Sequence, residues 1–302
     1  MSARSQSTIR KAAIAQEGLR ALLTLLVLGL FSTPGYGLDG EGLDNRKEDD
    51  EKLTCGKVIT FEYRGHECVV IVPKGTVDKE RRCVYISPPS LAYKGKFPQM
   101  AFYAETLLAK GFHIAGISMG GSASSAGSPA GAQLHYEFYQ LVTREFKLHK
   151  KARLVGQSNG GLNQYAWAFR HPEAVDRVLG LLAVTDFRTW PSLDNIVHPT
   201  PPFRIPEDIS FKMTLEELLA NIKELNPIDN LAPLAKAGVK IYHIHGDDDG
   251  TVPIDPNALE FERRYRALGG EITVEVGKGY GHWTPQPFYN ENQRALRFLI
   301  AD

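Results

Sequence analysis

Short apolar runs alternate with longer helix-like segments along most of this 302-residue chain, and this alternation constrains the fold more than any other feature. Buried strands that alternate with helices form a mostly parallel sheet with helices on both faces. The sequence therefore predicts an α/β fold. Helices are expected at about Phe97 to Lys110, Gly131 to Leu148, Asn159 to Arg170, Asn257 to Leu268 and Asn290 to Ile300.

The stretch KVITFEYRGHECVVIVP opens the predicted domain and differs in pattern from the rest of the chain. Two β-rich runs flank Arg64-Gly65, which predicts a hairpin and thus antiparallel strands at one edge of the sheet. The residues before it, 38–54, are polar and rich in Gly and Asp, so we expect a flexible lead-in. The folded domain is expected to span residues 55–302.

Residues 1–37 have the pattern of a secretory signal peptide. Basic residues precede the apolar run ALLTLLVLGLF, and small residues come after it at Gly35 and Gly37. We predict cleavage after Gly37 and a secreted or periplasmic mature protein. A membrane anchor is the alternative, but the run is short of the roughly 20 apolar residues that span a bilayer.

Charge and cysteine content exclude several function classes. Lys plus Arg and Asp plus Glu both number 35, so no net field favours nucleic acid or, after signal cleavage, a membrane. The cysteines Cys55, Cys68 and Cys83 have no Cys-x-x-Cys spacing, which argues against a metal site. Buried thiols are the simpler interpretation, and whether two of them bridge stays open, as does the oligomeric state.

The stretch LVGQSNGGL contains a G-x-S-x-G pattern at the point where a strand is expected to turn into a helix. Glycines are needed at Gly156 and Gly160 because a Cβ would clash where strand and helix approach. Ser158 is therefore a candidate nucleophile. The alternative is a glycine-rich turn with a capping serine.

A serine nucleophile requires a histidine base and an acid that orients it. HGDDDGTVP comes after the expected strand VKIYHI, and GYGHWTP comes after the expected strand EITVEV. We predict Asp249 as the acid and His282 as the base, with Asp247 and Asp186 as alternative acids. A calcium loop at the aspartates is excluded because the EF-hand ligand spacing is absent.

GQSNG, HGDDDGTVP and GYGH, in this order, resemble the nucleophile, acid and histidine loops of the α/β-hydrolases. The resemblance covers about Cys55 to Asp302. It implies an eight-stranded, mainly parallel sheet with Ser158, Asp249 and His282 as the catalytic triad. We expect no metal and no cofactor.

Two donors are expected to form the oxyanion hole. One is the backbone N–H of Asn159, the residue after the nucleophile. The loop SPPSLAYKG has no His-Gly-Gly-Gly motif, and its two prolines have no N–H to donate. The second donor is therefore expected at Ser90 or Leu91.

Between about residues 187 and 231 the alternation breaks into a Pro-rich stretch, which predicts a small cap insertion. Within it, Thr214 and Glu217 fit a helix capping box. The loop from Gly116 to Gly131 is expected to line the pocket. The aromatic residues Trp190, Phe203 and Trp283 are candidates for an apolar or sugar-stacking wall, with simple packing as the alternative.

These observations predict a secreted serine hydrolase that cleaves carboxylic esters through an acyl-enzyme on Ser158. The predicted partner is a small-molecule or carbohydrate ester, the latter inferred from export alone. A serine peptidase or a lyase that uses the same triad is the first alternative. A non-catalytic binding protein on a hydrolase scaffold is the second.

Overall fold

The computed structural model describes residues 47–49, 53–88, 101–120, 125–199, 205–283 and 287–302. The predicted signal peptide lies outside these residues, as do Ser90, Leu91 and Phe203. Within the described part of the chain, no helix is both long and apolar enough to cross a membrane.

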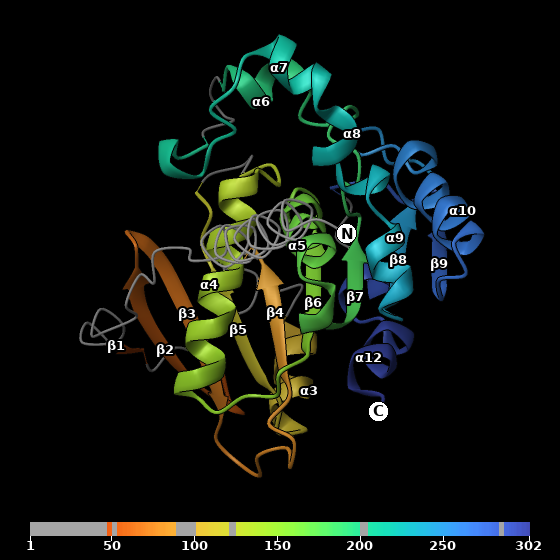
Figure 1. Cartoon of the computed structure of the whole chain (residues 1–302). Helices are drawn as coiled ribbons and strands as arrows, with labels where there is room; N and C mark the ends of the chain where they lie inside the picture. The colour runs from red at the N-terminus through yellow and green to blue at the C-terminus, as the bar shows by residue number, and fades with distance from the viewer. Residues whose placement is uncertain (1–46, 50–52, 89–100, 121–124, 200–204, 284–286) are drawn as a thin grey trace, which may run out of the picture. The chain divides into compact units, whose positions relative to one another are not determined.

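The described strands form one nine-stranded sheet in the order β1-β2-β3-β5-β4-β6-β7-β8-β9 (Figure 1). Every pair from β5 to β9 in this order is parallel, while β1, β2 and β3 add antiparallel pairs. Strands β2 to β9 confirm the predicted eight-stranded, mainly parallel sheet. The bounds are β1 Lys47–Asp49, β2 Gly56–Tyr63, β3 His66–Pro73, β4 Cys83–Ser87, β5 His113–Ile117, β6 Ala152–Gln157, β7 Val175–Leu181, β8 Lys240–Gly246 and β9 Ile272–Gly277.

The antiparallel edge of the sheet confirms the predicted hairpin and corrects the predicted lead-in. Arg64 and Gly65 both have positive φ, and Tyr63 pairs with His66, as a two-residue hairpin turn requires. The lead-in prediction is wrong at Lys47–Asp49, because these residues pair with β2. An edge strand has unpaired backbone groups that a short strand can satisfy, whatever its side-chain pattern.

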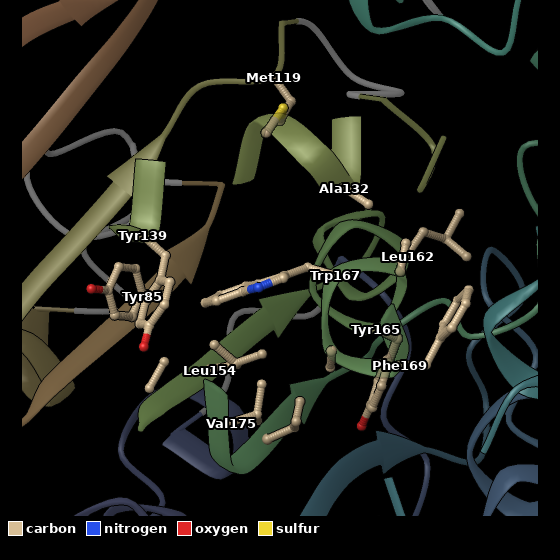
Figure 2. Close-up of a cluster of buried hydrophobic side chains, with 14 of the residues drawn as sticks. Tyr85, Met119, Ala132, Tyr139, Leu154, Leu162, Tyr165, Trp167, Phe169 and Val175 are labelled. Carbon is tan, nitrogen blue, oxygen red and sulfur yellow. The ribbon is translucent and has the colours of Figure 1, made fainter. Parts of the chain in front are cut away.

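Helices cover both faces of the sheet, and each face has its own apolar core. On one face lie α4 (Pro129–Glu145), α5 (Gly160–Arg170) and α10 (Glu260–Ala267); on the other lie α3 (Ala101–Ala109) and α12 (Gln293–Ile300). Figure 2 shows the first core, where Trp167 of α5 lies close to Tyr85 and Tyr139, with ring centroids 5.6 and 5.5 Å away. This packing fixes α5 against β4 and α4.

The five predicted helices are present, with shifted ends. Helix α4 begins earlier than expected because Ser128 caps it by accepting a hydrogen bond from the Gly131 N–H, and Pro129 fits its first turn. It ends at Glu145, before Lys147 adopts a φ of 52°. The last predicted helix, near Asn290 to Ile300, is α12 and begins later than expected, with α11 (Pro287–Asn290) before it. In the same way, η5 (Asp255–Leu259) precedes α10.

The cap segment, residues 187–231, contains short helices and no strand in the part of it that the structure describes. The helices are α6 Leu193–Val197, α7 Leu215–Ala220, α8 Ile222–Leu225, η3 Glu207–Ile209 and η4 Pro227–Asp229, and α9 Ala232–Lys236 comes next. Thr214 and Glu217 form both bonds of the predicted capping box. His66 Nε2 lies 2.7 Å from Asp208 Oδ2, and Ser128 Oγ donates to Ile209 O at 2.5 Å. These contacts bind η3 to β3 and to the start of α4.

Candidate active site

Ser158 lies at the turn between β6 and α5, at the carboxyl end of a central parallel strand. Its φ of 50° is in the left-handed region, where a Cβ is unfavourable. A Cβ on Gly156 would lie 2.9 Å from the carbonyl oxygen of Gly160, and one on Gly160 would lie 2.0 Å from the carbonyl oxygen of Ser87. The two glycines therefore permit a turn that is too tight for other residues, as the sequence motif predicts.

The structure brings Ser158, His282 and Asp249 into one hydrogen-bonded line. His282 Nε2 is 3.0 Å from Ser158 Oγ, and His282 Nδ1 is 2.8 Å from Asp249 Oδ2. Because a carboxylate only accepts, Nδ1 must carry a proton and donate it. In neutral His282 the lone pair of Nε2 then faces the serine hydroxyl, which is the tautomer that a general base needs.

Asp249 is held as a charged acceptor in a buried position. Its side chain is 0% exposed, and its Oδ1 accepts hydrogen bonds from the N–H groups of Thr251 and Val252. Burial alone would raise its pKa, but the hydrogen bonds from His282 and Val252 and the nearby imidazoles outweigh burial and lower the pKa. The carboxylate therefore stays ionised and orients the imidazole.

The acid loop and the histidine loop are joined by backbone contacts. Asp247 Oδ1 accepts a hydrogen bond of 2.6 Å from the Gly279 N–H, and the Asp248 N–H donates to Tyr280 O at 3.2 Å. A Cβ on Gly246 would lie 1.9 Å from the carbonyl oxygen of Tyr280. This close approach places the two loops so that Asp249 and His282 meet.

The alternative acids serve other contacts. Asp247 pairs with Lys278 Nζ at 2.9 Å as well as with the histidine loop. Asp186 pairs with Arg188 at 2.8 Å and accepts a hydrogen bond from Asn226 Nδ2 at 2.8 Å, so it holds one end of the cap segment. The described hydrogen bonds of His282 go to Ser158 and Asp249 instead.

The structure describes some of the remaining predicted site residues and leaves others outside the described part of the chain. Asn159 comes directly after the nucleophile as the N-cap of α5, whose N-terminus carries a positive partial charge. Ser90 and Leu91 lie outside the described residues. Trp190 packs partly buried against the core, whereas Trp283 is 78% exposed and its ring centroid lies 5.0 Å from that of His282.

A cavity of about 350 Å³ lies between the cap segment and the sheet. Ser118 and Gly120 line it, but Ser158, Asp249 and His282 do not, so the expectation that the loop from Gly116 to Gly131 lines the pocket of the nucleophile stays a prediction. The other residues that line the cavity are Arg64, Gly65, His66, Glu67, Pro206 and Asp208. In the described part of the chain, no group of His, Cys, Asp and Glu is arranged to hold a metal ion.

His245 lies near the site, although the sequence did not predict it there. It lies on β8, and its buried Nε2 donates to Val252 O at 2.7 Å and lies 3.6 Å from Asp249 Oδ2. Burial lowers its pKa, with the Asp249 charge acting in the opposite direction. The signal available was its spacing of four residues from Asp249 across the acid loop.

Together, the sheet order and the nucleophile turn define the α/β-hydrolase fold, and similarity to solved structures confirms it. Acylaminoacyl peptidase from Pyrococcus horikoshii is similar with a TM-score of 0.58 and 13% identity, over 85% of this chain and 42% of that chain. Porphyromonas gingivalis dipeptidyl peptidase 4 has a TM-score of 0.57 and 11% identity, over 82% of this chain and 35% of that one. Est1E from Butyrivibrio proteoclasticus has a TM-score of 0.54 and 14% identity, over 80% of this chain and 97% of that one.

The chain therefore spans less than half the length of the two peptidases and nearly all of Est1E. No protein-family model and no curated protein sequence matches it.

Proposed function

We propose that this protein is a serine hydrolase that transfers an acyl group to Ser158 and then to water. The observation that carries the proposal is the line of hydrogen bonds from Ser158 Oγ through His282 to the buried carboxylate of Asp249. A hydroxyl is a weak nucleophile, and a base with this tautomer is what activates it.

The proposed reaction has two halves. His282 Nε2 takes the serine proton as Oγ attacks the carbonyl carbon, and His282 then gives this proton to the departing alcohol, leaving an acyl-Ser158 ester. A water molecule next loses a proton to His282 and attacks the acyl carbon, and the proton returns to Ser158 Oγ as the acid departs. The N–H of Asn159 is proposed to stabilise the oxyanion in both halves.

Carboxylic esters are the proposed substrates because an alcohol departs more readily than an amine from the same tetrahedral intermediate. A carbohydrate-linked ester is proposed from the predicted export alone. A peptidase is the second candidate, and the fold similarity to the two peptidases favours it.

We also propose that the protein is secreted after cleavage at Gly37. The mass of the N-terminal peptide of the exported protein tests this proposal.

A fluorophosphonate probe tests the nucleophile. The purified protein is treated with the probe and the adduct is located by mass mapping, with Ser158→Ala as the matched control. An adduct on Ser158 that is absent from the variant supports the proposal. A folded wild-type protein without an adduct would contradict it and favour the binding-protein alternative.

Paired substrates separate the two candidate functions. An acyl p-nitrophenyl ester is compared with the p-nitroanilide of the same acyl group and with an acylated sugar. We expect turnover of the esters to exceed that of the anilide, with both activities lost in Ser158→Ala. A faster anilide reaction would make the protein a peptidase.

A further inference from the structure

Asn163 is a buried polar residue that the triad does not explain. It lies on α5, five residues after the nucleophile, and is 2% exposed. A buried amide is costly unless its hydrogen bonds are made. Its partners therefore indicate why the position is polar.

The Asn163 amide contacts two segments that border the nucleophile turn. Its Oδ1 accepts from Ser125 Oγ at 2.6 Å and from the Gly127 N–H at 3.3 Å, both in the segment before α4. Its Nδ2 donates to Ser87 Oγ at 3.3 Å, in the last residue of β4. One side chain thus joins α5 to the carboxyl end of the neighbouring strand and to the segment before α4.

Backbone packing at the same place leaves little free space. A Cβ on Gly160 would overlap the carbonyl of Ser87, and a Cβ on Gly127 would lie 2.8 Å from Leu162 O. The first turns of α5 are therefore enclosed between these two segments. Their relative positions determine where the turn presents Ser158 Oγ to His282.

We propose that Asn163 is a positioning residue for the nucleophile turn. Its amide holds Ser87 and the segment from Ser125 to Gly127 at fixed positions against α5, and so keeps Ser158 and the N-terminus of α5 aligned for reaction. The inference rests on the proposed function, because alignment matters only if Ser158 reacts.

Gln164 supplies a matched control from the next position of the same helix. It is 0% exposed, and its Nε2 donates to Tyr85 O at 2.9 Å and to Val155 O at 3.2 Å. These carbonyls belong to β4 and β6 before their carboxyl ends. Removing this amide removes a comparable amount of buried hydrogen bonding without releasing the segments beside Ser158.

The experiment compares Asn163→Ala with Gln164→Ala in the full chain. Melting temperature, kcat and KM are measured with the p-nitrophenyl ester, together with the affinity of a boronic acid that forms a tetrahedral adduct with serine. Both variants are expected to melt at lower temperatures. Asn163→Ala alone should lower kcat by about 10- to 100-fold at nearly constant KM, the effect expected of a small misplacement, and weaken boronate binding in proportion.

Equal losses of kcat in the two variants, or a change in KM alone, would overturn the inference. If Asn163→Ala does not fold, Ser125→Ala removes the shortest of the three bonds and should lower kcat in the same way; unchanged kcat would then count against the role of Asn163. The wild-type adduct on Ser158 separates this result from failure of the proposed function, because its absence contradicts the function itself.

Discussion

At the scale of single residues, the backbone of Ser158 is strained for its side chain. An L-residue in the left-handed region costs about 1–2 kcal/mol relative to the right-handed one. In this conformation the hydroxyl lies within hydrogen-bond distance of His282 Nε2. Such strain is characteristic of functional sites.

Two replacements of Ser158 distinguish its contribution to backbone strain from its contribution to turnover. Ser158→Ala keeps the Cβ and should leave the melting temperature nearly unchanged while abolishing turnover. Ser158→Gly should also abolish turnover but be more stable than Ser158→Ala by up to about 1 kcal/mol, because glycine adopts positive φ without a Cβ clash. Equilibrium denaturation measures this difference, and equal stabilities would show that the turn is unstrained.

The lowered pKa of Asp249 predicts that protonation of this carboxylate does not limit turnover at mildly acidic pH. The carboxylate should stay ionised at mildly acidic pH, so it keeps accepting the hydrogen bond from His282 Nδ1. Asp249→Asn should reduce kcat by about 10³- to 10⁴-fold, since the amide favours the wrong imidazole tautomer. A kcat for Asp249→Asn close to that of the wild type would contradict this role of Asp249.

At the scale of elements, the site depends on how two loops fit together. The acid loop comes after β8 and the histidine loop after β9, so parallel pairing brings both to the same edge of the sheet. Gly246 marks their closest approach. Asp249 and His282 are therefore positioned by backbone contacts as well as by their own hydrogen bond.

Two glycines of the acid loop provide a matched test of this fit. Gly246→Ala would place a Cβ 2.4 Å from Tyr289 Oη and even closer to Tyr280 O, so both activity and melting temperature should fall. Gly250→Ala would add a carbon with no atom of the described residues within 4 Å, and should be tolerated in both respects. Equal effects of the two substitutions on activity and melting temperature would show that packing at Gly246 does not position Asp249 and His282.

Much at this scale was predictable because strands and motifs leave local signals. The parallel strands, the hairpin and the Ser158, Asp249 and His282 positions all derive from apolar runs and glycine patterns. The strand β1 and the role of Asn163 could not be predicted, because both depend on partners distant in sequence. Asp247 and Asp249 have equivalent local sequence, so only the loop geometry distinguishes the acid from its neighbour.

At the scale of the whole molecule, buried histidines determine the response to acid. His113, His135 and His243 are buried, and burial is the main cause that lowers their pKa values to about 4, 3 and 3. Unfolding exposes these rings to water, where histidine has a pKa near 6.5. The unfolded state therefore binds more protons between pH 6.5 and the folded pKa values, and stability falls as the pH falls through this window.

We expect the free energy of unfolding to decrease from pH 7 to pH 5 by about 1–2 kcal/mol for each of these histidines. Denaturant titrations at the two pH values measure the change. His113→Leu should make the decrease smaller, because leucine takes up no proton on unfolding. The variant loses no hydrogen bond, since neither ring nitrogen of His113 has a partner among the described residues. An unchanged pH dependence in this variant would show that His113 contributes nothing to acid sensitivity.

The rate at which a reagent modifies the free thiols can report how often the sheet opens. Cys68 on β3 and Cys83 on β4 are buried on the two strands that flank β5, and burial raises the pKa of both thiols, whereas Cys55 is only partly covered. A disulfide reagent reacts with exposed thiolates, so it should modify Cys55 first. Modification of the other two then requires the strands around β5 to separate, and its rate measures how often the centre of this sheet opens while the protein remains otherwise folded.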